Sequence, residues 1–181
     1  MNVWRLVVGL AGYVIYRRFV IRAPLKETLR APVIIGPGAA LEYRNILVPV
    51  KPGRASEEAI DFACRLATER RASIVALAVV VVPLEEAIDT QLDEEERRAD
   101  DALDSAAAIA ELYGVNLIER LVRARSAGRA IVDEASRRAS EIIVMGAPRT
   151  DRPRAVLSET VDFVLKHAPS RVMVVAGRMA A

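Results

Sequence analysis

Residues 45–50 read NILVPV, and every residue after the asparagine is apolar. A half-exposed strand alternates apolar and polar residues, and this run does not. Such a run is typical of a short strand that is buried on both faces, as in a parallel sheet covered by helices. The run therefore indicates the fold class to expect for the residues that follow it.

Further apolar runs follow at regular intervals, and segments with a single apolar face separate them. The predicted strands are residues 45–50, 73–82, 115–122, 141–145 and 171–176. The predicted helices are residues 55–70, 94–113, 128–139 and 157–167. Gly114 stands where a left-handed cap would end the second of these helices. The alternation predicts right-handed βαβ units, and so an α/β fold with a five-stranded parallel sheet and helices on both faces.

The loops at one edge of such a sheet are the first place to look for a ligand. Ligands bind beyond the carboxyl ends of parallel strands, where the order of the strands reverses. The loops expected at that edge are residues 51–54, 79–83, 123–126 and 146–158.

The first 22 residues predict a membrane-type helix. Residues 6–16 form an uncharged apolar run flanked by Arg5 and by Arg17 and Arg18. A full span needs about twenty residues, which residues 3–21 reach when the arginines extend toward the headgroups. The basic residues after the run predict that the following domain lies on the cytoplasmic side of the cell membrane. The alternative is a soluble amphipathic helix that packs on the domain or on a partner.

Charge and composition agree with a globular domain behind this segment. Hydrophobic residues make up 52% of the 181-residue chain, which predicts a substantial core. The positive charge is concentrated before residue 45, so an anionic membrane surface is a better partner for it than nucleic acid. Residues 23–43, interrupted by proline and glycine, are predicted to be a linker. Residues 44–177 form the predicted domain and residues 178–181 a tail.

Residues that support catalysis or metal binding are scarce. The chain has one cysteine, Cys64, and one histidine, His167. Each falls within a predicted helix and away from the strand ends, so we expect neither a metal site nor a nucleophilic pair. The acidic run at residues 93–96, with Asp100 and Asp101, is interpreted as a solvated helix face. We therefore expect a protein that is not an enzyme.

The closing stretch of the domain resembles a known family. Residues 141–175 read EIIVMGAPRTDRPRAVLSETVDFVLKHAPSRVMVV, and together with NILVPV they resemble a universal stress protein domain. The resemblance implies an adenine-nucleotide alpha-hydrolase-like sheet and a homodimer formed through the last strand. The family has ATP-binding and non-binding branches. The binding branch uses an aspartate after the first strand and a loop of the form G-x2-G-x9-G-S/T after the fourth.

Compared with that pattern, the phosphate-binding loop of this chain is altered. Gly146 matches the first glycine, and Arg149 stands at the second. With one residue deleted, Ser158 and Glu159 fall at the last two positions, and without a gap Glu159 and Thr160 do. A side chain at a glycine position prevents close approach of the backbone, and Glu159 repels a phosphate. The resemblance therefore implies a degenerate nucleotide site with no cofactor.

Basic residues gather in the same loops and favour an alternative. Lys51 replaces the aspartate, and Arg149, Arg152 and Arg154 lie in the loop after the fourth strand. Basic side chains can replace amide donors around an anion, which would make the chain a sensor of ATP, AMP or a cyclic dinucleotide. The candidate ligand-binding residues are Pro49, Val50, Lys51, Val79, Gly146, Arg149, Ser158 and Glu159.

The N-terminal segment resembles, more weakly, the end of an amino-acid permease. In some such transporters the last helix closes with Tyr-Arg-Arg, as in Tyr16, Arg17 and Arg18 here, and a universal stress protein domain follows. This chain would then be a detached tail, the product of a truncated gene, or an independent subunit. The first hypothesis is a membrane-associated regulatory module that binds lipid or an integral membrane transporter through residues 1–22.

Overall fold

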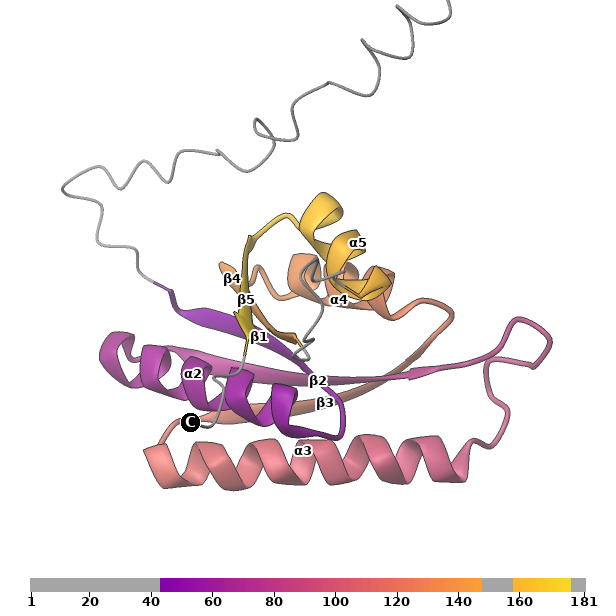
Figure 1. Ribbon diagram of the computed structural model, residues 1–181, viewed down its shortest axis with the longest axis horizontal. Coiled ribbons are helices and arrows are strands. Elements are labelled where there is room, and N and C mark those ends of the chain that lie inside the picture. Colours follow the sequence, from indigo (N-terminus) through magenta and orange to yellow (C-terminus); the bar gives the residue numbers. More distant parts are fainter. Residues whose placement is uncertain (1–42, 148–157, 177–181) are drawn as a thin grey trace, which may run out of the picture. The chain divides into compact units, whose positions relative to one another are not determined.

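The computed structural model describes residues 43–147 and 158–176, which form five strands and four helices. The strands are β1 (Asn45–Val50), β2 (Ser73–Val81), β3 (Leu117–Ala124), β4 (Ile142–Ala147) and β5 (Arg171–Ala176). The helices are α2 (Arg54–Arg70), α3 (Asp93–Tyr113), α4 (Ala127–Arg137) and α5 (Glu159–His167). All strand pairs are parallel, in the order β3-β2-β1-β4-β5 (Figure 1). The predicted five-stranded parallel α/β sheet is confirmed.

Helices cover both faces of the sheet, as the apolar run at residues 45–50 predicts. Ile46, Leu47 and Val48 are completely buried. Alternate side chains of a strand point to opposite faces, so Ile46 and Val48 pack with α2 and α3, and Leu47 packs with α4 and α5. Figure 1 shows these two helix pairs on opposite sides of the sheet. After Asn45 the strand lacks polar residues because its central side chains meet no water on either face.

The third strand begins and ends two residues later than the sequence predicts. Gly114 adopts the expected left-handed conformation (φ 62°) and ends α3. The backbone N–H of Val115 then donates to the carbonyl of Ala110, so this residue still belongs to the turn after the helix. At the other end, Ala124 extends β3 because it pairs with Val81 of β2.

Serine caps set the true beginnings of α4 and α5. Ser126 accepts a hydrogen bond from the Arg129 N–H at 3.4 Å, and Ser158 accepts one from the Val161 N–H at 3.3 Å. The last helix therefore begins at Glu159 and not at residue 157. The predicted helix at 128–139 ends earlier, at Arg137, and Ala139 has a left-handed backbone (φ 48°). The predicted strand at 141–145 is β4, which continues to Ala147 beside β5.

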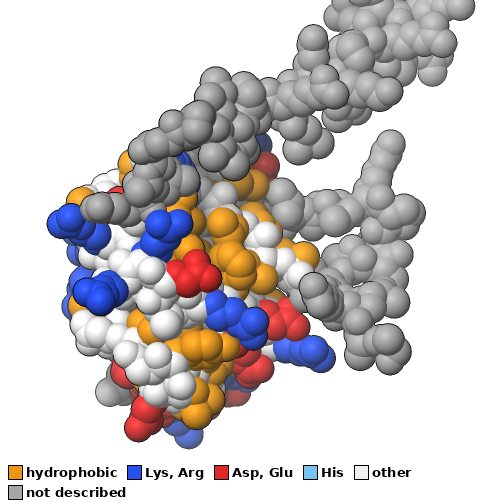
Figure 2. All heavy atoms as spheres, turned by 90° about the vertical axis from the view of Figure 1, so that its left-hand side faces the viewer, with side chains coloured by type: hydrophobic (Ala, Val, Ile, Leu, Met, Phe, Trp, Pro, Cys, Tyr) orange, Lys and Arg blue, Asp and Glu red, His pale blue; other side chains and the backbone are white. Residues whose placement is uncertain are grey.

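Contacts between strand starts hold the amino edge of the sheet together. The Asn45 N–H of β1 donates to the carboxylate of Glu141 at 2.7 Å, next to the start of β4. The guanidinium of Arg171, the first residue of β5, lies 6.0 Å from the centre of the Tyr43 ring. On this side of the domain, charged side chains of both signs surround apolar ones (Figure 2).

Several predictions concern residues outside the described part of the chain. These are the membrane-type helix at residues 1–22, the permease-like sequence within it, the linker up to residue 42 and the tail at 178–181. Of the helices that the structure describes, none combines the length and apolar character required to cross a bilayer.

A buried carboxylate joins α4 to the edge strand β3. Glu134 is 2% exposed, and Arg120, Arg137 and Arg138 lie 3.6, 2.7 and 2.5 Å from its oxygens. Burial raises the pKa of Glu134, but the hydrogen bond from Arg138 and the three positive charges outweigh this effect. The net result is a pKa below the usual value. The ionised form of Glu134 is therefore the form that stabilises the fold.

Replacing Glu134 by Gln should lower the free energy of unfolding by about 1–3 kcal/mol at neutral pH, since it leaves buried groups incompletely paired. The pKa is lower in the folded than in the unfolded state. The stabilisation is thus present above the unfolded pKa and is lost as the pH falls through the folded pKa. Urea denaturation of both proteins at decreasing pH should show the difference shrinking. Asp133→Asn, which removes an exposed carboxylate of α4, is the control, and a difference independent of pH would contradict this role.

Candidate functional site

A cavity lies where the order of the strands reverses. From β1 the chain proceeds to β2 and β3 on one side of the sheet and then returns to β4 and β5 on the other. The carboxyl ends of β1 and β4 therefore border a space that no crossover connection fills. A cavity of about 230 Å³ occupies this position, lined by the ends of β1, β2 and β4 and by the starts of α4 and α5. We call it the β1–β4 crevice.

The structure brings together six of the eight candidate residues named from the sequence. They line the crevice and are Pro49, Val50, Lys51, Val79, Gly146 and Ser158. Glu159 does not line it: this residue is exposed in the first turn of α5. Arg149 lies outside the described residues, as do Arg152 and Arg154.

Most of the crevice wall was not named from the sequence. Leu77 and Val81 of β2 line it, together with Ile131 of α4 and Met145 of β4. Strand periodicity would have identified the first two, because they lie two residues on either side of Val79 and so share its face. Thr160 and Val161 complete the wall from α5. The result is a mainly apolar slot with a few polar groups, the usual character of a small-molecule site.

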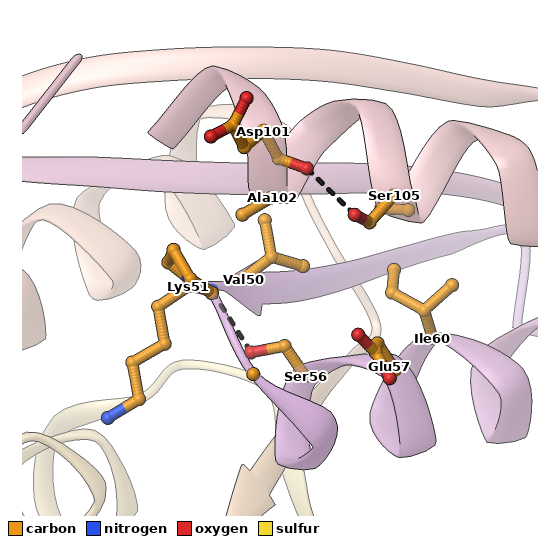
Figure 3. Close-up of a pocket in the computed structure, with 11 residues that line it drawn as sticks. Val50, Lys51, Ser56, Glu57, Ile60, Asp101, Ala102 and Ser105 are labelled. Carbon is orange, nitrogen blue, oxygen red and sulfur yellow. Dashed lines mark hydrogen bonds between the residues drawn. The ribbon is translucent and has the colours of Figure 1, made fainter. Parts of the chain in front are cut away.

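The turn after β1 positions Lys51. Its backbone N–H donates to the hydroxyl of the buried Ser56 at 3.0 Å (Figure 3). The Ser56 N–H in turn donates to the carbonyl of Gly53 at 3.0 Å. Gly53 has φ 121°, a conformation that favours glycine, and it immediately precedes α2. The side chain of Lys51 is exposed. Among the described residues, it is the only cationic side chain that lines the crevice.

Gly146 is required by packing. A Cβ atom at this position would lie 2.0 Å from the carbonyl oxygen of Ala55, in the first turn of α2. The end of β4 thus approaches the backbone of α2 more closely than any side chain would permit. This glycine matches the first position of the phosphate-binding pattern, yet the contact with α2 is enough to explain it.

The start of α5 is poorly suited to hold an anion. Helix N-termini attract negative charge, but Glu159 and Asp162 already place two carboxylates in the first turn. The hydroxyl of Ser158 accepts from the Val161 N–H, and the carbonyl of Ser158 accepts from the Asp162 N–H at 2.9 Å. The charges and the capping contacts therefore leave little attraction for a phosphate at this end of the crevice.

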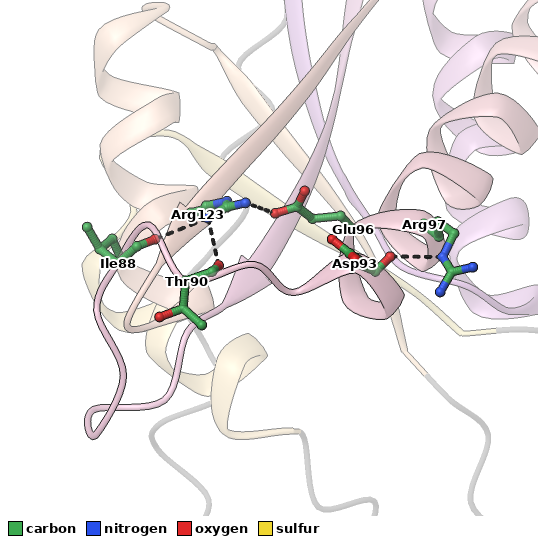
Figure 4. A network of polar contacts seen from close by, with 6 residues as sticks. All are labelled: Ile88, Thr90, Asp93, Glu96, Arg97 and Arg123. Carbon is green, nitrogen blue, oxygen red and sulfur yellow. Dashed lines mark hydrogen bonds and ion pairs between the residues drawn. The ribbon is translucent and has the colours of Figure 1, made fainter.

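Two arginines at the end of β3 serve the fold, although residues 123–126 were expected to face a ligand. Arg123 donates to the carbonyls of Ile88 and Thr90, at 3.4 and 2.9 Å, and pairs with Glu96 at the start of α3 (Figure 4). Arg125 donates to three carbonyls of the same loop, those of Val82, Pro83 and Glu86. These contacts hold residues 82–92 against the end of β3.

The reactive side chains of the described residues lie away from the crevice. Cys64 is buried in α2, where burial, aided by Asp61, raises the pKa of its thiol to about 11, so the thiol stays protonated. His167, at the far end of α5, stacks on Phe163 and contacts its carbonyl through Nδ1 at 2.8 Å. Within residues 43–147 and 158–176, no group of acidic, histidine or cysteine side chains is arranged to hold a metal ion.

Solved structures similar to this chain share its fold. UspA from Lactobacillus plantarum is 29% identical, with a TM-score of 0.62 over 74% of this chain and 98% of that chain. The universal stress protein from Archaeoglobus fulgidus in complex with dAMP is 21% identical, with a TM-score of 0.59 and coverage of 74% and 98%. A family protein from Arabidopsis thaliana with AMP bound is 16% identical, with a TM-score of 0.55 and coverage of 75% and 92%.

Sequence comparison agrees with the structural likeness. No curated protein matches the chain significantly. The model of the Universal stress protein family matches residues 42–176, a segment that includes every strand and helix described above. The chain belongs to the universal stress protein family.

Proposed function

We propose that this chain is a regulatory binding module whose β1–β4 crevice takes an adenine nucleoside or nucleotide. The crevice itself carries the proposal: its walls from β2 and α4 are apolar, as the site of an aromatic ring requires, and Lys51 also lines it. The dAMP and AMP complexes of proteins with the same fold support this class of ligand. The proposed role is binding without catalysis.

The ring and the sugar should contribute most of the affinity. Of the described crevice residues, only Lys51 offers a positive charge to a phosphate, while Glu159 and Asp162 place two carboxylates at the start of α5. Each added phosphate therefore gains little attraction and meets more repulsion. We propose that the site discriminates weakly between adenosine and AMP and does not favour ATP.

Isothermal titration calorimetry of the full-length chain tests this proposal. Adenosine and AMP should bind, and ATP should bind no more tightly than AMP. Val81→Asp should weaken all three by about tenfold, since it puts a carboxylate into the apolar wall. Lys51→Ala should weaken AMP by about fivefold and leave adenosine nearly unchanged.

Arg70→Ala is the matched control. This arginine is exposed in the last turn of α2, at the opposite end of the helix from the turn that holds Lys51, and its removal should leave every affinity unchanged. The absence of binding by all three ligands would refute the proposal. Tight binding of ATP alone would instead favour a site in which basic residues have replaced the glycines of the phosphate loop.

The edge strand β5 supports the proposal of a homodimer formed through the last strand. Within the described residues β5 pairs only with β4, so its other edge offers unpaired backbone groups. The side chains of residues 172–175 are apolar and only partly buried. Sedimentation equilibrium over a range of protein concentrations should give twice the mass of the chain, and a monomer throughout would contradict this proposal.

We also propose that the chain associates with the membrane through residues 1–22 and that its partner there is a transporter. The apolar run and the following arginines of the sequence motivate it. The full-length chain should float with phosphatidylcholine vesicles that contain an anionic lipid, and an inserted helix should keep it there at high salt. A protein that stays at the bottom of the gradient would rule out this role.

A further inference from the structure

A groove follows the junction of α2 and α3. Its first part, about 240 Å³, lies between the first turns of α2 and the middle of α3 (Figure 3). Its second part, about 430 Å³ and wider, lies between α2 and the C-terminal end of α3. Glu57 lines both parts, so we treat them as one surface, the α2–α3 groove.

The floor of the groove is apolar because small residues stand where α3 faces α2. Ala102 and Ala106 leave room above Val50 and Ile60 in the first part. Ile109 and Leu112 line the second part. Leu112 is 85% exposed, the highest value for a large apolar side chain in the described part of the chain. An apolar side chain from another molecule could thus fill the space above Ala102 and Ala106, and a second one could contact the exposed Leu112.

Carboxylates border this floor. Glu57 of α2 and Asp101 of α3 line the first part, and neither makes an ion pair with another described residue. Other acids are already engaged: Glu58 pairs with Arg54 at 2.9 Å, and Asp61 pairs with Arg65 at 3.0 Å. Helix α3 as a whole carries eight acidic and two basic residues, so acidic side chains outnumber the cations Lys51 and Arg54 that also line the groove.

We propose that the α2–α3 groove docks a basic amphipathic helix of a partner protein. Apolar residues spaced by three and four positions would fill the hollow above Ala102 and contact Leu112, as in other helix-in-groove complexes. Lysine or arginine residues on its flanks would meet Glu57 and Asp101. This surface lies on the face of the sheet opposite α4 and α5, and the inference does not depend on ligand binding in the crevice.

A synthetic helical peptide with leucine at every third or fourth position and lysine elsewhere serves as the probe. Fluorescence anisotropy with the full-length chain should detect its binding, which should weaken as salt is raised. A peptide of the same composition with its leucines dispersed should bind at least about fivefold more weakly, since it presents no apolar stripe to the floor. Equal binding of the two peptides would overturn the proposal, and so would no binding of the first.

Substitutions in the α2–α3 groove test whether the peptide binds there. Glu57→Gln combined with Asp101→Asn should weaken binding by about fivefold, and Leu112→Ser should weaken it further. Glu119→Gln combined with Asp133→Asn removes the same charge from exposed positions on β3 and α4, and it should leave binding unchanged. All of these positions are exposed, and thermal unfolding verifies that the variants fold. Equal losses in the two double variants would show attraction by net charge alone and refute the docking site.

Discussion

The burial of β1 on both faces is the constraint on which the rest of this structure depends. Side chains that alternate between the two faces of the strand have no access to water, so helices must cover both sides of the sheet. Parallel crossovers provide that cover, and they place neighbouring strands on either side of the first one. The reversal of strand order beside β1, and with it the crevice, follows from this arrangement.

The turn after β1 connects this packing to function. Ser56 accepts the backbone N–H of Lys51, and Gly146 of β4 lies against the backbone of α2 just before Ser56. Val50, Lys51 and Ser56 line both the β1–β4 crevice and the first part of the α2–α3 groove. A ligand on one side and a protein segment on the other would therefore contact the same short turn. The proposed regulatory role needs coupling between two sites, and this turn is the contact that they share.

Several charged side chains in this domain act as ties between elements. Arg123 and Arg125 hold the loop between β2 and α3 by its carbonyls, and Glu134 of α4 pairs with Arg120 of β3. Arg120, Arg123 and Arg125 contact partners that lie 14 to 43 residues away from them in the sequence. Among the described crevice residues, Lys51 is the one cationic side chain left to contact a phosphate. The described part of the crevice, with its apolar walls and one lysine, is better matched to a ring than to a chain of phosphates.

The sequence by itself determined the order and type of the elements, because apolar periodicity and glycine at the α3 cap are local properties of the chain. It also determined the family, and it located six residues of the crevice wall through the ends of the strands. Tertiary structure alone decided that Ile131 of α4 and Val161 of α5 complete that wall, that Gly146 meets the backbone of α2, and that Arg123 binds a loop. These features depend on distances between segments far apart in the sequence, which local periodicity does not encode.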